Sequence, residues 1–184
     1  MVTQAVDTRP ATGARRPGSY LAIERSIRID APPERVWALI HDVGRSPEWA
    51  GSGEVRAMQR LDAGPIGVGT RYRSDQKVRG MGYQTISTVQ VYEPNRLLIW
   101  HVAPPNDVRS AWGFRLEPEA GGTRLTHFYD LDHPRGFPKR VLYRLMFRVL
   151  NRPAELGGHI AATLQNVKTL VETQPAAAST GGTP

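Results

Sequence analysis

The sequence predicts an α+β fold in which a curved, seven-stranded antiparallel sheet wraps around a long C-terminal helix, with two short helices after the first strand. Three observations support this prediction. Apolar and polar residues alternate at the start of the domain, further strand-like segments follow with short breakers between them, and the last segment repeats apolar residues at helical spacing. Consecutive strands joined by short turns indicate an antiparallel meander. The amphipathic helix is the element long enough to cover one face of that sheet.

The first strand is expected over residues 20–30, where apolar side chains share one parity and polar side chains the other. Two prolines followed by Glu34 favour the start of a helix, because missing N–H groups cost nothing in the first turn and the helix dipole favours an acid there. Apolar residues over 36–43 then have helical spacing, and we expect this helix to end at Gly44. A second short helical turn is expected over 46–49.

Six more strands are expected over 51–61, 70–78, 82–92, 97–102, 108–117 and 123–131. The C-terminal helix carries one apolar stripe, formed by Leu142, Leu145, Val149, Pro153, Leu156, Ile160, Leu164, Val167 and Val171. A proline ordinarily breaks the interior of a helix, yet the stripe keeps its phase across Pro153. We therefore expect either one long helix kinked at this proline or two helices docked nearly end to end.

The folded domain is expected over residues 19–173. Residues 1–18 and 174–184 lack hydrophobic periodicity and are expected to be disordered tails. A domain of this length buries roughly 70% of the surface that its unfolded chain exposes, so it needs neither disulfides nor a metal to hold its core.

The composition excludes several classes of protein. The chain of 184 residues contains no cysteine, which excludes a disulfide framework, cysteine-ligated zinc, iron–sulfur clusters and thiol catalysis. It carries 24 Lys and Arg against 17 Asp and Glu, a basic balance that permits contact with nucleic acid or an anionic membrane but indicates neither. No apolar run approaches the roughly 18 residues of a membrane span, and the N-terminus lacks the apolar segment of a secretory signal, so we expect a cytoplasmic protein.

Strand parity indicates which side chains face the concave side of the sheet. A curved sheet wrapped around a helix leaves a space that usually becomes a ligand cavity. Its predicted lining combines aromatic and small polar residues: Tyr72, Ser74, Gln76, Ser110, Trp112, Phe114, Leu125 and Tyr129 from the strands, with Leu164 from the helix. Such a lining suits a flat apolar ligand held by a few hydrogen bonds. The alternative is that these side chains fill a solid core, and we favour the cavity.

His127 faces the same side and is the candidate catalytic residue, because the ordinary imidazole pKa of about 6.5 suits a general acid–base. The alternative is a buried neutral imidazole hydrogen-bonded to Tyr129, Tyr72 or the backbone, and we favour this structural role. His41 and Asp42 form a second pair at the end of the first predicted helix. A histidine there interacts favourably with the helix dipole, which we favour over a catalytic dyad.

No metal or cofactor site is predicted. Asp130, Asp132 and His133 lie near His127 in sequence, but His127 and Asp130 fall on opposite faces of their strand. The glycine-rich segment 64–69 lacks the lysine of a phosphate-binding loop and leads into a strand. No nucleic-acid-binding motif is recognisable. We therefore expect no metal, no cofactor and no nucleic-acid partner.

Four arginines recur every fourth residue opposite the apolar stripe: Arg140, Arg144, Arg148 and Arg152. A solvated outer face is the expected interpretation of this row. Like charges at this spacing repel one another mildly, which keeps a second interpretation open. In that interpretation the arginines contact an anionic membrane surface or an acidic partner.

Four stretches together resemble a known family: IRIDAPPERVWALIHDVGRSPEW from Ile27, GVGTRY from Gly67, VYEPNRL from Val91 and LEPEAGGTRL from Leu116. They resemble the START-like helix-grip superfamily (SRPBCC), in particular its polyketide cyclase/dehydrase and lipid-transport branch, over about residues 20–172. The resemblance implies the helix-grip fold and a hydrophobic pocket. Cyclases of this kind generally use an arginine and tyrosines inside the pocket, whereas parity places Arg71 and Arg73 outside.

Three hypotheses for the function follow. The first is binding of a small hydrophobic ligand, lipid-like or polyketide-like, in a cavity between the sheet and the C-terminal helix. The alternative is an enzyme of the polyketide cyclase, aromatase or dehydratase type that uses the same pocket, although no complete catalytic constellation is recognisable. The second alternative is an interaction protein that uses the arginine face. The sequence predicts no particular oligomeric state.

Overall fold

The computed structural model describes residues 19–103, 109–134 and 136–173, so the predicted tails lie outside the described residues. The elements in chain order are β1 (Leu21–Ile29), α1 (Pro33–Ile40), a 3-10 turn (Val43–Arg45), α2 (Ser46–Trp49), β2 (Val55–Arg60), β3 (Arg71–Val78), β4 (Met81–Glu93), β5 (Leu97–Ala103), β6 (Ser110–Glu119), β7 (Gly122–Leu131), α3 (Phe137–Val149) and α4 (Arg152–Thr173). The predicted α+β fold is confirmed. Within the described ranges, no helix combines the length and apolar character needed to cross a membrane.

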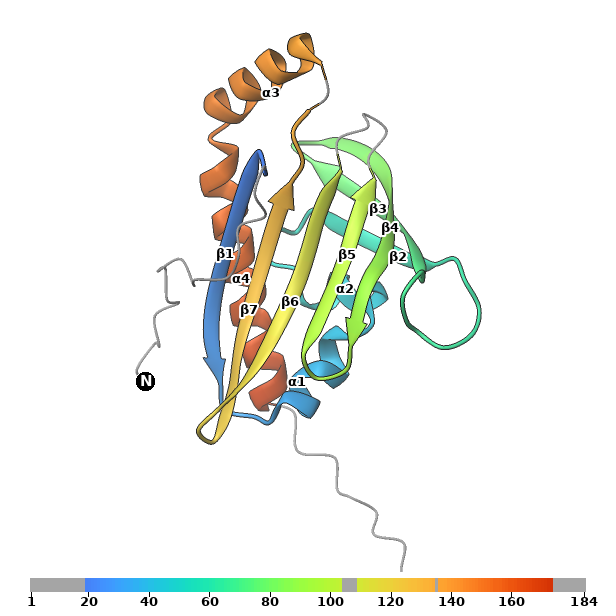
Figure 1. Cartoon of the computed structure of the whole chain (residues 1–184), viewed down its shortest axis with the longest axis vertical. Helices are drawn as coiled ribbons and strands as arrows, with labels where there is room; N and C mark the ends of the chain where they lie inside the picture. The colour runs from blue at the N-terminus through green and yellow to red at the C-terminus, as the bar shows by residue number, and fades with distance from the viewer. Residues whose placement is uncertain (1–18, 104–108, 135, 174–184) are drawn as a thin grey trace, which may run out of the picture.

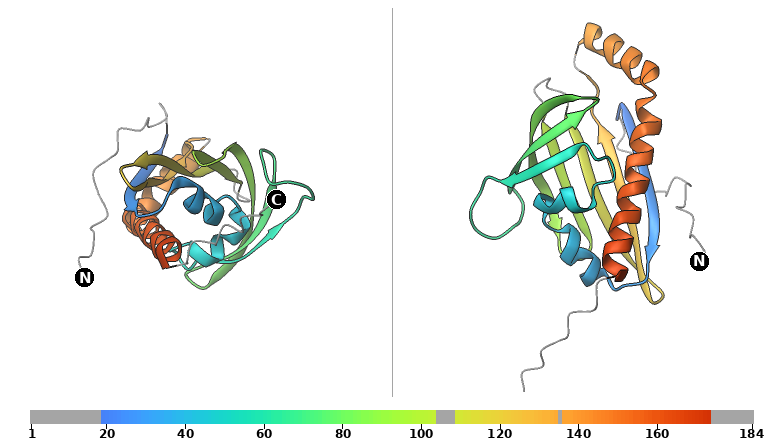
Figure 2. Two further views of the ribbon diagram at one scale, coloured as in Figure 1. Left: turned by 90° about the horizontal axis from the view of Figure 1, so that it is seen from below. Right: turned by 180° about the vertical axis from the view of Figure 1, so that it is seen from behind.

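The strands form one antiparallel sheet of seven strands in the order β1-β7-β6-β5-β4-β3-β2. Strands β2 to β7 are therefore a simple meander, and β1 joins its far edge by pairing with β7. The sheet curves so that α1, α2 and α4 lie on its concave side, with α4 running alongside β1 (Figures 1 and 2). This arrangement is the helix-grip architecture.

Helix α1 begins where the sequence predicts and ends earlier. Pro33 occupies its first turn, where a proline lacks no needed hydrogen bond. The helix ends at Ile40 rather than Gly44. The reason is that Asp42 adopts an extended backbone and its Oδ1 accepts a hydrogen bond from the Gly44 N–H at 2.8 Å, which starts a separate 3-10 turn.

The C-terminal segment consists of two helices, not one kinked helix. The break lies at Asn151, whose φ of 46° is in the left-handed region that asparagine tolerates better than most residues. Pro153 therefore falls in the first turn of α4, where it disrupts nothing. Helix α3 leaves the axis of α4 at an angle instead of continuing it end to end (Figure 1).

This break divides the apolar stripe into two parts with different fates. In α4 the stripe joins the core through Leu156, Ile160, Leu164, Val167 and Val171, all of them buried. In α3 the prediction of a buried stripe is wrong, since Leu142, Leu145 and Val149 are 60%, 59% and 70% exposed. The change of direction turns a different face inward, and Phe147 of α3 packs edge-on against Tyr20 with ring centroids 5.7 Å apart.

We predict that Leu164→Asp destabilises the protein by about 4 kcal/mol or more, because it places an unpaired charge at a position with no exposed surface. Arg148→Glu, on the exposed face of α3, is expected to change the free energy of unfolding by about 0.5 kcal/mol or less. Urea denaturation of both variants measures the difference. Equal tolerance of the two substitutions would contradict this facing of the helices.

Candidate functional site

A cavity of about 670 Å³ lies between the concave face of the sheet and the helices. Its volume falls within the range of small-molecule sites. The apolar part of its lining comes from both the strands and the helices and includes Val43, Met58, Trp100, Trp112, Tyr143, Phe147 and Leu156. Met81, the first residue of β4, lines the cavity and is also 71% exposed, so the cavity opens to the surface beside the β3–β4 turn.

The structure separates the predicted pocket residues into two groups. Six of the sequence-derived candidates line the cavity: Ser74, Gln76, Ser110, Trp112, His127 and Tyr129. The other four lie in the solid core and are fully buried: Tyr72, Phe114, Leu125 and Leu164. These four side chains pack against other core residues and do not line the cavity, contrary to the expectation from the sequence. The Tyr72 hydroxyl, for example, donates to Asp42 Oδ1 at 2.9 Å and so points away from the cavity.

His127 is held as a neutral ring. Its Nδ1 lies 2.9 Å from the Gly113 carbonyl oxygen, which can only accept, so Nδ1 carries the proton and Nε2 is an acceptor. The ring stacks on Phe114, with centroids 4.2 Å apart, and on Trp112 at 5.6 Å. Burial lowers its pKa to about 4. These properties favour the structural interpretation of His127, because an imidazole that stays neutral near pH 7 cannot act there as a cationic acid.

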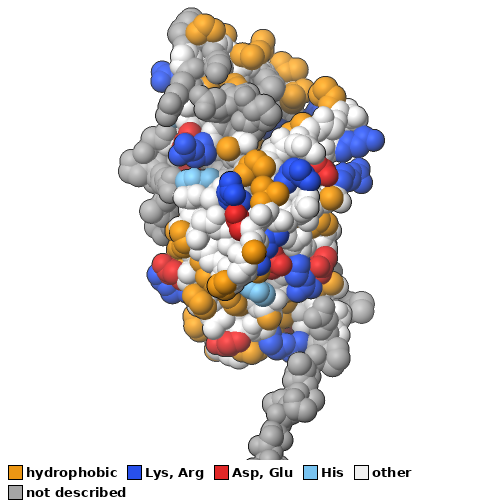
Figure 3. All heavy atoms as spheres, turned by 90° about the vertical axis from the view of Figure 1, so that its right-hand side faces the viewer, with side chains coloured by type: hydrophobic (Ala, Val, Ile, Leu, Met, Phe, Trp, Pro, Cys, Tyr) orange, Lys and Arg blue, Asp and Glu red, His pale blue; other side chains and the backbone are white. Residues whose placement is uncertain are grey.

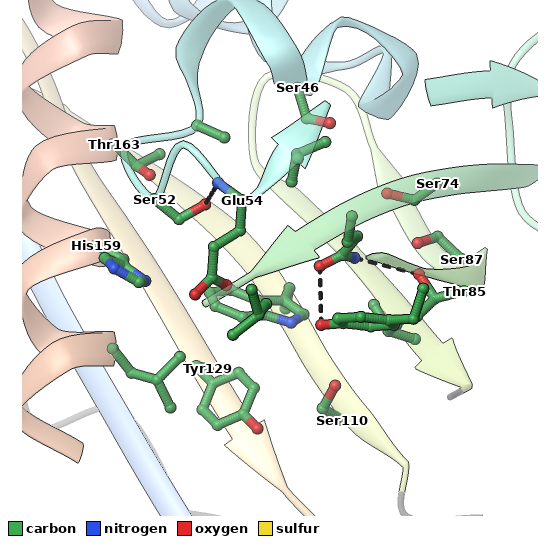
Figure 4. Close-up of a pocket in the computed structure, with 18 of the residues that line it drawn as sticks. Ser46, Ser52, Glu54, Ser74, Thr85, Ser87, Ser110, Tyr129, His159 and Thr163 are labelled. Atoms are coloured by element: carbon green, nitrogen blue, oxygen red, sulfur yellow. Dashed lines mark hydrogen bonds between the residues drawn. The ribbon is translucent and has the colours of Figure 1, made fainter. Parts of the chain in front are cut away.

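The polar part of the lining has two regions on opposite sides of the cavity. The first is a wall of hydroxyl groups from Ser46, Ser74, Thr85 and Ser87, which lie on one side in Figure 4, across from His159 and Thr163 of α4. All four hydroxyl-bearing residues are buried, at 5% exposure or less. The Oγ atoms of Ser46 and Ser74, and the nearby indole N–H of Trp49, have no hydrogen-bond partner among the described residues.

The second region is an ionic cluster. The Arg152 guanidinium binds Glu54 with both nitrogens, at 3.1 and 3.3 Å, and Glu155 at 2.9 Å. Arg79 reaches Glu155 from the β3–β4 turn at 3.5 Å. The hydrogen bond from Arg152 lowers the pKa of the Glu155 carboxyl. Two arginines and two glutamates thus balance one another beside the cavity.

Glu54, Glu155 and His159 present ligand atoms within 4.8 Å of one another, a spacing that a metal ion could bridge. The guanidinium of Arg152 already occupies oxygens of both carboxylates. A divalent cation would have to displace this arginine. We therefore interpret the cluster as a network of ion pairs and not as a metal site.

Sequence periodicity does not identify Arg152 and Glu54 as site residues. Helical spacing places Arg152 in the solvated arginine row, but its side chain is only 20% exposed. The row is interrupted at Asn151, so Arg152 begins a new helix and faces another way than Arg148. Glu54 was placed inside a strand over 51–61, whereas β2 begins at Val55.

The segment before β2 is a turn held against α4 by a close approach at Gly51. A Cβ atom at Gly51 would lie 2.4 Å from the Ala162 Cβ, so only glycine fits. The Gly51 N–H donates to Thr163 Oγ1 at 2.8 Å. This tether positions Glu54 opposite Arg152 and could not be read from strand periodicity.

We predict that His127 makes stability pH-dependent. In the unfolded chain His127 binds a proton near pH 6.5, whereas in the folded protein it does so only near pH 4. Between pH 6.5 and pH 4 the unfolded state therefore holds more protons, and the free energy of unfolding decreases as the pH is lowered. The expected loss is about 2 kcal/mol between pH 7 and pH 5. Urea denaturation at both values should show this loss diminished in His127→Gln and retained in His133→Gln, a variant of an exposed histidine. An unchanged loss in His127→Gln would contradict the neutral assignment.

The fold and the enclosed space define a helix-grip protein, and the family follows from the sequence match. The chain belongs to the family described as polyketide cyclase / dehydrase and lipid transport, whose model matches residues 21–172. This match confirms the resemblance found in the sequence.

Individual relatives agree with that placement. The chain is 32% identical over 109 residues to the uncharacterized protein Rv0088 of Mycobacterium tuberculosis, a match covering 59% of this chain and 46% of that protein. The chain thus matches about half the length of this curated relative. Among solved structures, the Polyketide_cyc-like protein Cgl2372 of Corynebacterium glutamicum is 28% identical with a TM-score of 0.56, covering 82% of this chain and 91% of the other. The Zhui aromatase/cyclase of Streptomyces sp. R1128 is 17% identical with a TM-score of 0.61, covering 83% and 93%, and shows likeness of fold alone.

Proposed function

We propose that the protein binds a small, largely apolar molecule that carries at least one oxygen group, in the cavity between the sheet and the C-terminal helices. The size of the cavity supports this proposal, because about 670 Å³ accommodates a small-molecule ligand. Its aromatic walls, which include Trp100, Trp112 and Tyr129, provide the flat apolar contacts that such a molecule needs.

The observation that carries the proposal is the set of buried donors without partners at the hydroxyl wall. A buried polar group without a hydrogen bond costs roughly 1–3 kcal/mol. Ser46, Ser74 and Trp49 all border the cavity and all carry such an atom. A ligand oxygen at this wall accepts from these donors, which ties the oxygen-bearing end of the ligand to one side of the cavity.

The ionic cluster narrows the ligand chemistry further. The charges of Arg152 and Arg79 are balanced by Glu54 and Glu155, so this region offers no uncompensated cation to an anionic ligand. Burial raises the pKa of Tyr129, so its hydroxyl remains protonated and can donate. These groups favour a neutral ligand with carbonyl or hydroxyl oxygens over a phosphate or a carboxylate.

We predict that Ser74→Ala weakens binding of a long-chain alcohol or ketone about threefold to tenfold, the effect of one neutral hydrogen bond. Binding of an alkane of the same length should not weaken, because the alkane lacks the oxygen. Displacement of a fluorescent apolar dye measures both affinities. Ser26→Ala is the matched control, since Ser26 is a buried serine bonded to Thr126 and does not border the cavity. Equal losses for alcohol and alkane would contradict a hydrogen-bonding role for the wall.

We predict that Trp112→Ala weakens binding of every ligand by about 1–3 kcal/mol, the contribution of a buried apolar side chain. The same dye displacement assay measures it. A wild-type protein that binds neither the dye nor any acyl or polyketide-like compound would sink the proposal of a ligand cavity.

A second candidate function is cyclisation or dehydration of a polyketide-like substrate. The observation that favours it is an arginine beside the cavity, Arg152, together with the protonated hydroxyl of Tyr129. The Tyr129 hydroxyl and an N–H of the paired Arg152 guanidinium can each donate to a substrate carbonyl oxygen and so polarise it. Glu54 accepts from the same guanidinium and holds it in place.

For this candidate we predict turnover of a linear poly-β-ketone thioester, and a fall of about 10²-fold in rate for Arg152→Met with affinity largely kept. Product formation is followed by mass spectrometry. Arg56→Gln, on the exposed side of β2, is the matched control. Tight binding of the thioester without any product would contradict the enzyme candidate and support binding as the function.

A further inference from the structure

Helix α3 presents two exposed strips of different character. The first is apolar and consists of Val141, Leu142, Leu145 and Val149, which are between 51% and 70% exposed. The second is cationic and consists of Arg140, Arg144 and Arg148, all exposed. At 3.6 residues per turn the two strips are adjacent on the helix, while Tyr143 and Phe147 occupy the face turned toward the cavity.

All charged residues of α3 are basic. Its sequence, FPKRVLYRLMFRV, contains four basic residues and no acid. Elsewhere arginines pair with carboxylates, as Arg45 does with Glu48 and Arg124 with Glu119. Among the described side chains, no carboxylate pairs with Arg140, Arg144 or Arg148.

The exposed apolar surface extends beyond α3. Met81, the first residue of β4 after the β3–β4 turn, is 71% exposed and lines the same cavity as Tyr143 and Phe147. The β3–β4 turn and α3 therefore lie at the same end of the molecule, the upper end in Figure 1. Figure 3 shows hydrophobic side chains gathered at that end, with basic side chains close by.

We propose that α3 and the β3–β4 turn form a docking surface for an anionic phospholipid bilayer. An apolar strip bordered by arginines is the pattern of a helix that lies in a membrane interface, with its apolar side among the acyl chains and its cations at the lipid headgroups. The absence of acids on α3 complements a negative surface in particular. Docking in this way places the opening of the cavity against the bilayer.

This surface does not depend on the proposed function, because vesicle binding needs no ligand in the cavity. The test is flotation of the full-length protein with vesicles of phosphatidylcholine alone and with vesicles that also contain phosphatidylglycerol. We expect binding to the anionic vesicles only, weakening as salt screens the arginines.

Substitutions assign the contact to α3. Leu145→Asn combined with Val149→Asn should reduce vesicle binding at least tenfold, because both remove apolar groups that enter the interface. Val68→Asn is the matched control, since Val68 is 70% exposed at a distant loop, as exposed as Val149. Arg144→Gln and Arg148→Gln should each reduce binding about fivefold, whereas Arg56→Gln should leave it unchanged.

Three results would overturn the proposal. One is no binding to the anionic vesicles, and another is an equal loss in the Val68→Asn or Arg56→Gln control. The third is a dimer in sedimentation that Leu145→Asn dissociates, which would assign the strip to a second copy of the chain.

Discussion

The molecule depends on the packing of α4 against only one part of the concave sheet. Leu156, Ile160 and Leu164 bury their side chains in the core, and α4 lies closest to β1 and β7. The concave side of β3, β4 and β5 is therefore not covered by α4, and several of their inward side chains, among them Ser74, Thr85 and Trp100, border the cavity instead. The placement of α4 over β1 and β7 thus determines which part of the concave face is packed as solid core and which part borders the cavity.

Local periodicity was sufficient to predict the seven strands, the existence of the helices and the cavity side of Ser74, Ser110 and Tyr129, because alternation and helical spacing are properties of neighbouring residues. Strand parity does not predict whether an inward side chain borders the cavity or packs in the solid core. Ser74 and Tyr72 share a parity, yet Ser74 borders the cavity and Tyr72 bonds to Asp42 in the core. The pairing of Arg152 with Glu54 joins residues 98 positions apart and has no local signal.

The break at Asn151 explains the largest error of the sequence analysis. The apolar stripe keeps its phase across this residue, so periodicity alone favours one continuous buried face. A single left-handed residue changes the direction of the chain without altering that spacing. The same residue therefore brings Arg152 to the cavity and leaves the apolar strip of α3 in contact with solvent.

The tryptophans have a practical consequence. Of the four in the chain, Trp49, Trp100 and Trp112 border the cavity, and Trp112 lies 4.5 Å from the Tyr129 ring. The fourth, Trp37, packs against Tyr92. Three of the four indole rings of the chain thus lie at the cavity wall, where a bound molecule changes their surroundings. The emission spectrum of the unlabelled protein therefore serves as a built-in optical reporter of whether the cavity is filled.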